Sequence, residues 1–124
     1  MAADGDSVAM DKATPKSPEV SWRDHLVMLL NIAAEIEHGL MVQYLYSAYS
    51  IDSRGRPPEI AEKLEDWRSH ILTIAREEMG HFITVQNILR LMGAPMNLAR
   101  KNFPWDVEYY PFPFRLEPMS VSYT

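Results

Sequence analysis

The sequence predicts an all-α protein: a long antiparallel hairpin of two helices, equal to half of a helical bundle, with an extended C-terminal segment. Apolar residues recur at alternating steps of four and three along two long stretches, the pattern of a helix with one buried face. A short Gly- and Pro-containing segment, 52–58, separates these stretches. The remainder, 96–124, is rich in proline and aromatic residues, so we expect it to lie extended along a helix surface.

The first predicted helix begins after Ser21, whose hydroxyl suits the N-cap position, and has Asp24 near the positive end of its dipole. It runs to about Tyr49. Residues 1–20 show no periodicity, so we expect a disordered arm there and a helical domain over 21–124. The apolar stripe of this helix, here called the first stripe, comprises Leu26, Leu30, Ala33, Glu37, Leu40, Tyr44 and Ser47.

The second predicted helix runs from about Glu59 to Met92, and Gly93 followed by Pro95 ends it. At ~1.5 Å per residue it is on the order of 50 Å long, which is typical of a bundle or a coiled coil. Its second stripe comprises Ile60, Leu64, Trp67, Ile71, Ile74, Glu78, His81, Val85, Ile88 and Met92.

Composition excludes several classes of function. The chain has 124 residues, no cysteine and a net charge of -5, so thiolate metal sites and disulfides are excluded and nucleic-acid binding is not expected. No uninterrupted apolar run reaches the roughly 18 residues of a membrane span, and the N-terminus lacks the apolar centre of a signal peptide. We therefore expect no membrane association and a cytoplasmic protein.

Three polar residues interrupt the stripes: Glu37 in the first, and Glu78 with His81 in the second. Burying such groups is costly unless they are paired, hydrogen-bonded or bound to a metal. Glu37 lies about 14 residues before the turn and Glu78 about 19 after it, so at ~1.5 Å per residue their levels differ by roughly 7 Å. Glu-x-x-His facing a bundle interior is half of a carboxylate-bridged dimetal site. We predict that Glu37, Glu78 and His81 are metal ligands.

Oxygen and imidazole donors suit iron, manganese or zinc, and carboxylates that bridge two ions favour iron or manganese. A zinc-protease motif is excluded, because no His stands four residues from His81. His38 points about 100° away from Glu37, so we expect it to hydrogen-bond a ligand and not to bind the metal. Tyr44 either bonds a ligand, or gates access to it, or is a core tyrosine. His25 and His70 are not expected to be ligands.

A structural alternative remains for the pair on the second helix. Glu78 could simply pair with Arg76 or with His81, with no metal involved. No catalytic side chain beyond the metal ligands and no organic cofactor site are predicted.

The residues resemble a known family. The segments Glu37–Leu45, Arg76–His81, Gly93–Pro95 and Tyr110–Pro111 resemble the ferritin-like domain of the iminophenyl-pyruvate dimer synthase type, over about residues 21–119. The resemblance implies a four-helix bundle with a di-iron centre in which Glu37, Glu78 and His81 are ligands. In the named synthases the implied activity is oxidative coupling of an amino-acid-derived imine, which would make this chain an oxidoreductase. Nothing in the sequence fixes the substrate.

The chain encodes only half of such a site. A complete one needs a second Glu and a second Glu-x-x-His, supplied by a missing C-terminal half or by a second copy about a twofold axis. We favour a homodimer, because the first helix is apolar nearly all round and must be covered. The residues off its stripe are Val27, Leu29, Ile32, Ile36 and Met41.

Two further hypotheses stay open. The chain could be a non-catalytic helical interaction module, in which Glu37 and His81 set the register of a partner helix. It could also be a truncated ferritin-like fragment that folds without catalysing a reaction.

Overall fold

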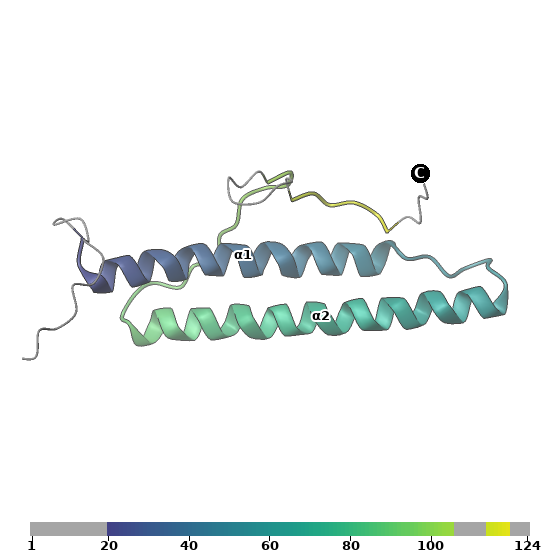
Figure 1. Ribbon diagram of the computed structural model, residues 1–124, viewed down its shortest axis with the longest axis horizontal. Helices are drawn as coiled ribbons and strands as arrows, with labels where there is room; N and C mark the ends of the chain where they lie inside the picture. The colour runs from purple at the N-terminus through teal and green to yellow at the C-terminus, as the bar shows by residue number, and fades with distance from the viewer. Residues whose placement is uncertain (1–19, 106–113, 120–124) are drawn as a thin grey trace, which may run out of the picture.

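The computed structural model describes residues 20–105 and 114–119, and two long antiparallel helices dominate it (Figure 1). Helix α1 spans Trp22–Ser50 and helix α2 spans Pro58–Leu91. The described residues form no strand, only an isolated β-bridge between Trp105 and Phe114. The predicted all-α half bundle is confirmed, with helix ends one residue from those expected. The predicted arm, 1–20, lies outside the described residues except for Val20.

Local interactions fix the ends of the helices. The Asp24 backbone N–H donates to Ser21 Oγ at 3.1 Å, which caps α1 as predicted. The loop turns at Gly55, whose φ of 69° is accessible to glycine at little cost. Arg68 on α2 donates to the carbonyl of Ile51, so the carboxyl end of α1 is tied to the other helix.

The helices meet along a line of small residues. Ala34 and Ala48 of α1 and Ala75 of α2 are completely buried, and Leu89 is the largest side chain that is also fully buried. Small side chains at the contact allow the helix backbones to approach closely, and close packing maximises dispersion contacts. The buried core of the hairpin therefore combines small residues on both helices with the large side chain of Leu89.

The predicted stripes are buried only in part. Ile60 and Trp67 of the second stripe each keep 49% of their surface exposed, and Leu26 of the first stripe is exposed as well. The prediction of continuous burial was wrong at these positions. A two-helix hairpin offers each helix one neighbour, so only the part of each stripe nearest that neighbour is covered, whereas a complete bundle would cover the whole stripe.

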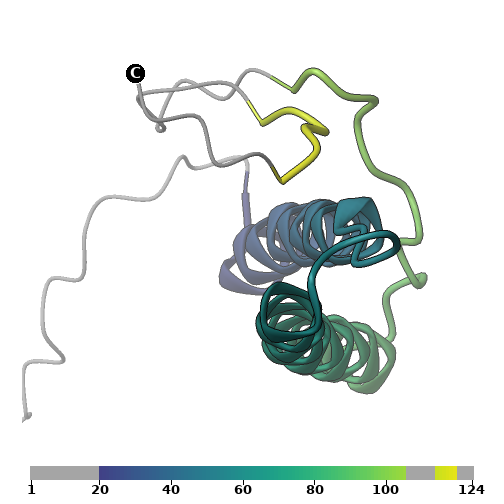
Figure 2. The ribbon, with the colours of Figure 1, turned by 90° about the vertical axis from the view of Figure 1, so that its right-hand side faces the viewer.

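The C-terminal segment passes over the face of α1 that points away from α2 (Figure 2). Trp105 and Phe114 are both buried, and their backbones exchange hydrogen bonds of 2.8 and 2.6 Å. The Trp105 ring lies so close to Gly39 that a Cβ there would approach it to 2.9 Å. An extended segment carrying aromatics onto a helix is thus observed at Trp105. The other predicted aromatics, Tyr109, Tyr110 and Phe112, lie outside the described residues.

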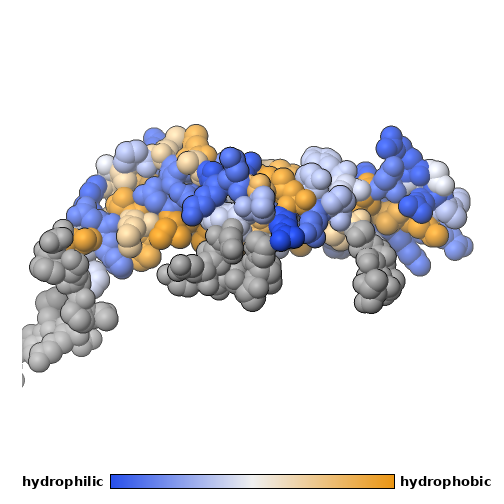
Figure 3. Space-filling model, turned by 90° about the horizontal axis from the view of Figure 1, so that it is seen from above, coloured by the Kyte–Doolittle hydropathy of each residue, from blue (hydrophilic) through white to orange (hydrophobic). Residues whose placement is uncertain are grey.

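Large hydrophobic side chains reach the surface, and some of them are seen among polar ones from the side of α1 (Figure 3). On α1 they include Leu29 and Ile32, and on α2 they include Ile83 and Leu91. By length and composition α1 also meets the requirement for a membrane-crossing helix, a requirement that the core helix of a soluble bundle satisfies equally.

Candidate metal centre

The antiparallel packing brings the three predicted ligands together. Glu37 lies in the middle of α1, and Glu78 and His81 lie one turn apart on α2. One potential ligand atom from each lies within 4.8 Å of the other two. The level difference of roughly 7 Å expected from the sequence is therefore absorbed by the stagger of the helices and the length of the loop.

The geometry within this group, here called the Glu–Glu–His cluster, leaves one ligand open to solvent. His81 Nδ1 lies 3.5 Å from Glu37 Oε2 and 3.4 Å from Glu78 Oε2. The side chains of Glu37 and Glu78 are 24% and 14% exposed, whereas that of His81 is 60% exposed. The carboxylates therefore lie between the helices, and the imidazole stands at the edge of the hairpin.

The electrostatics of the cluster favour an added positive charge. Glu37 Oε2 is buried and has no hydrogen-bond partner among the described residues. Burial first, and then the neighbouring Glu78 carboxyl, raise the pKa of Glu37, while His81 opposes this shift. Two carboxyl groups this close repel one another when both are ionised. A cation held between them would satisfy the unpaired oxygen and remove the repulsion.

The donor set fits a metal ion. Two carboxylates and one imidazole suit iron, manganese or zinc, and a carboxylate between helices can bridge two ions. Nδ1 is the His81 nitrogen that faces both carboxylates. The cluster offers three protein donors, which leaves further coordination positions of an octahedral ion open.

His38 and Tyr44, the two α1 residues expected near the ligands, have different surroundings. His38 packs against Phe82 of α2, with ring centroids 5.1 Å apart, and its Nδ1 is buried without a hydrogen-bond partner among the described residues. The expected bond from His38 to a ligand is therefore not formed. Tyr44 is half-buried and makes no hydrogen bond within the described part of the chain, which leaves its alternative roles open.

The remaining polar candidates lie away from the cluster. His25 contacts the Trp22 ring, and His70 pairs with Asp66 at 3.6 Å. Glu78 pairs with His81 and not with Arg76, which is exposed.

Sequence reasoning missed one buried polar residue that supports this fold. The Gln86 amide exchanges two hydrogen bonds with the backbone of Asn97, one of them 2.8 Å long, and Asn97 Nδ2 donates to the carbonyl of Asn31 at 3.4 Å. These bonds tie the C-terminal segment to both helices. One sign of this role is visible in the sequence: Gln86 follows Val85 of the second stripe and so lies beside the predicted buried face. A buried amide needs hydrogen-bond partners, so Gln86 could have been expected to bind another segment.

The fold and the cluster define a class of protein, and comparison with known families gives the same one. The family model described as Ferritin-like matches residues 30–123, so the chain belongs to the ferritin-like family. The family resemblance seen in the sequence is thereby confirmed. No solved structure matches the chain.

Two curated relatives are enzymes with named activities. The chain is 31% identical over 131 residues to a dichlorochromopyrrolate synthase of Lentzea aerocolonigenes, with 88% of the chain covered. It is 31% identical over 136 residues to a 2-imino-3-(indol-3-yl)propanoate dimerase of Chromobacterium violaceum, with 87% covered. In both cases the match spans only 13% of the relative's length. The chain therefore corresponds to a small part of each of these enzymes.

Proposed function

We propose that the chain forms half of a carboxylate-bridged dinuclear metal centre, with Glu37, Glu78 and His81 as ligands, and that a second copy of the chain completes it. Iron is the preferred metal and manganese the alternative, because both accept bridging carboxylates with imidazole. The observation that carries the proposal is the convergence of three donor groups from two helices around a buried carboxylate oxygen without a hydrogen-bond partner.

Twofold association supplies the right number of ligands. Two copies bring together four Glu and two His, which is the ligand set of ferritin-like dinuclear proteins. His81 is mostly exposed, which leaves it accessible to an opposing hairpin. The exposed apolar residues Leu29 and Ile32 of α1 give such a hairpin hydrophobic surface to cover.

A bound dinuclear iron centre supplies dioxygen activation and one-electron chemistry. The chain's own residues have simpler roles. Glu37 and Glu78 would hold the metal through carboxylate oxygens placed between the helices, and His81 would provide the nitrogen donor. Burial of Glu37 Oε2 limits access by water, which strengthens electrostatic interactions at that atom.

We extend the proposal to an oxidase activity related to that of the two relatives. Their names describe enzymes that make dichlorochromopyrrolate or dimerise an indolyl imino acid. Support for a similar activity comes from the 31% identity, which covers most of this chain. Whether this portion suffices for turnover is decided by assaying the metal-loaded chain for dioxygen consumption in the presence of indolyl imino acids.

Metal content tests the site itself. The chain is reconstituted anaerobically with ferrous iron, separated by size, and analysed for iron per chain. We expect about one iron per chain, lost in Glu78→Gln and kept in Glu77→Gln, because Glu77 is the exposed neighbour outside the cluster. Background iron in a well-folded wild-type protein, or equal iron in both variants, contradicts the proposal.

A second candidate function rests on the exposed apolar surface. A helical interaction module would use this surface to bind a partner helix and would need no metal. His81→Ala separates the two functions. It abolishes metal binding under the proposed function, whereas under the alternative the wild-type protein has background metal and the variant associates at least as well as the wild type.

A further inference from the structure

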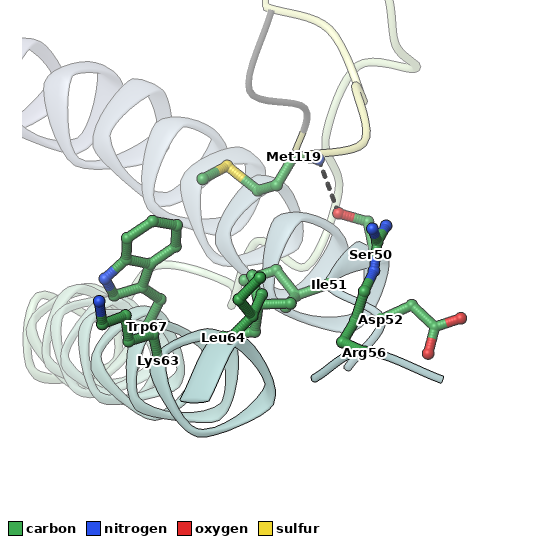
Figure 4. A pocket seen from close by; sticks show the side chains of 9 residues that line it. Ser50, Ile51, Asp52, Arg56, Lys63, Leu64, Trp67 and Met119 are labelled. Carbon is green, nitrogen blue, oxygen red and sulfur yellow. Dashed lines mark hydrogen bonds between the residues drawn. The ribbon is translucent and has the colours of Figure 1, made fainter. Parts of the chain in front are cut away.

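A hollow of 620 Å³ opens at the loop end of the hairpin, between the end of α1, the loop, the first turns of α2 and the C-terminal segment (Figure 4). Along α2 its nearest lining residue, Trp67, is 11 positions from Glu78, which is roughly 16 Å of helix. It is therefore separate from the Glu–Glu–His cluster. Its lining consists of Ser50, Ile51, Asp52, Arg56, Ile60, Lys63, Leu64, Trp67 and Met119.

The floor and walls of the hollow are apolar. Ile51 is buried and Leu64 is half-buried, whereas Ile60, Trp67 and Met119 each keep about half of their surface exposed. Large apolar side chains that line one concave surface and stay exposed are typical of a ligand site.

The wall formed by Met119 is fixed in place by a tertiary contact. Its backbone N–H donates to Ser50 Oγ at 2.7 Å, and the Ser50 hydroxyl in turn donates to the carbonyl of Ser47 at 2.7 Å. The C-terminal segment is thereby attached to the end of α1 at the edge of the hollow. One chain thus provides several sides of the hollow, which favours a small ligand over a partner helix.

The charged residues at the hollow are not equally engaged. Asp52 accepts from the Arg54 guanidinium at 2.8 and 3.1 Å and from the Arg54 backbone N–H at 3.0 Å. These bonds lower the pKa of Asp52 to about 2, and the side-chain bonds to Arg54 contribute most. Asp52 is therefore already paired with Arg54. The Arg56 guanidinium, by contrast, makes no ion pair and no hydrogen bond to any residue that the structure describes.

Lys63 is a weaker candidate for binding an anion. It extends beside Trp67 (Figure 4), but it also borders a shallow depression with three acidic residues, whose charges offset its own. These residues are Glu59, Glu62 and Asp66. Arg56 therefore remains as the cation available to a ligand, and its charge also helps to lower the pKa of the neighbouring Asp52.

We propose that this hollow binds a small amphipathic carboxylate, whose apolar body lies over Leu64 and against Trp67 and whose carboxylate pairs with Arg56. Guanidinium groups bind carboxylates through two parallel hydrogen bonds, which fixes the orientation of the anion. The apolar lining contributes most of the affinity, because the charged contact is exposed to solvent. The hollow contains none of the three proposed metal ligands, and it stays open only if the second hairpin of the proposed dimer leaves Ile60 and Trp67 uncovered.

A matched pair of probes tests the proposal on the full chain labelled with ¹⁵N. We expect 4-phenylbutyrate to shift the amide signals of Ile51 and Leu64 and the indole N–H signal of Trp67. 4-phenylbutyrate should bind about fivefold more tightly than 4-phenylbutan-1-ol, which lacks the carboxylate. This ratio corresponds to about 1 kcal/mol, the contribution of an exposed ion pair. Arg56→Gln should remove this preference. Arg90→Gln, an exposed cation at the other end of α2, should keep it.

Three results overturn the proposal: equal binding of the two probes by the wild type, shifts confined to the surface around Leu26 and Ile32, or no binding at millimolar concentration. Trp67→Ala adds a second test. Provided its helical circular dichroism is retained, it should bind both probes about tenfold more weakly, because one apolar wall is lost. Unchanged affinity of Trp67→Ala contradicts the proposed position of the ligand. If Trp67→Ala does not fold, the comparison of the two probes on Arg56→Gln tests the proposal.

Discussion

The face on which α1 and α2 meet differs from their outward faces in how deeply its side chains are buried. Ala34, Ala48 and Ala75 are completely buried where the helices meet, whereas Leu29 and Ile32 are about half exposed on the outward side of α1. Small residues suit a close contact between two helices. Large apolar residues left at a surface suit a contact that has yet to form.

In the proposed dimer, one contact folds the hairpin and a different contact completes the metal site. The closed contact positions Glu37 beside Glu78, and it needs only one chain. The outward faces keep large apolar side chains exposed, and in the proposed dimer a second hairpin covers them. We therefore expect variants on the closed contact to change unfolding of the hairpin, and variants on the outward faces to change association.

The largest effect is expected from truncating the closed contact. Leu89 is completely buried and Leu91, two residues on, is 88% exposed. Leu89→Ala should lower the free energy of unfolding by about 2–5 kcal/mol, because it removes packed atoms and leaves a cavity. Leu91→Ala should change it little. Urea denaturation followed by circular dichroism measures both, and equal effects would contradict the proposed division between the faces.

The contact between α1 and the C-terminal segment gives the next effect. A Cβ at Gly39 would approach the Trp105 ring to 2.9 Å, whereas a Cβ at Gly80 meets no atom within 4 Å. Gly39→Ala should displace the buried Trp105 and lower stability by roughly 1–3 kcal/mol. Gly80→Ala should raise stability by about 0.5–1 kcal/mol through higher helix propensity. Thermal denaturation and tryptophan fluorescence check this contrast, and a stabilised Gly39→Ala variant would exclude a tight contact.

Polar substitution on the outward side of α1 should weaken association and spare the hairpin. Ile32→Gln is expected to raise the dimer dissociation constant about five- to tenfold, as for burial of part of one aliphatic side chain. Glu62→Gln on the polar surface of α2 is the control. Sedimentation equilibrium measures the dissociation constant. An unchanged value for Ile32→Gln would place the association surface elsewhere.

The smallest effect concerns Glu37 in metal-free protein. Its folded-state pKa is raised, so the folded chain holds its proton more tightly than the unfolded chain. The protonated Glu37 carboxyl therefore adds to the free energy of unfolding. This contribution is fully present below the pKa of Glu37 in the unfolded chain, and it is lost as pH rises through the pKa of Glu37 in the folded chain. Glu37→Gln should therefore raise the stability of the metal-free protein at pH 7 and flatten its pH dependence. Denaturation at pH 4.5 and pH 7 tests this, and lower stability of the variant at pH 7 would contradict it.

Much of the fold and of the cluster could be predicted from local chemistry. Ser21, Pro58 and Gly93 mark the helix ends, because capping, proline and left-handed glycine act over a few residues. The periodic spacing of Glu37 and Glu78 in their stripes placed both carboxylates at the helix contact. A periodic pattern and one short loop suffice to align two helices.

Other features depend on contacts between distant residues and were not predictable. Ile60 and Trp67 of the second stripe are half exposed because, among the residues that the structure describes, only one helix packs against α2. The number of neighbouring helices cannot be predicted from the sequence of α2 alone. The approach of Trp105 to Gly39 depends on the path of the C-terminal segment. The hollow next to Arg56 depends on the same segment, because Met119 forms one of its walls.

Native mass spectrometry of the iron-loaded chain tests the central claim most directly, since it reports the number of chains and of metal ions in one particle. We predict a dimer of two chains with two iron ions, in which neither His81→Ala nor Glu37→Gln retains metal. A single chain that holds its iron without a partner, or a stable dimer that binds none under the same conditions, would contradict a metal centre shared between two copies.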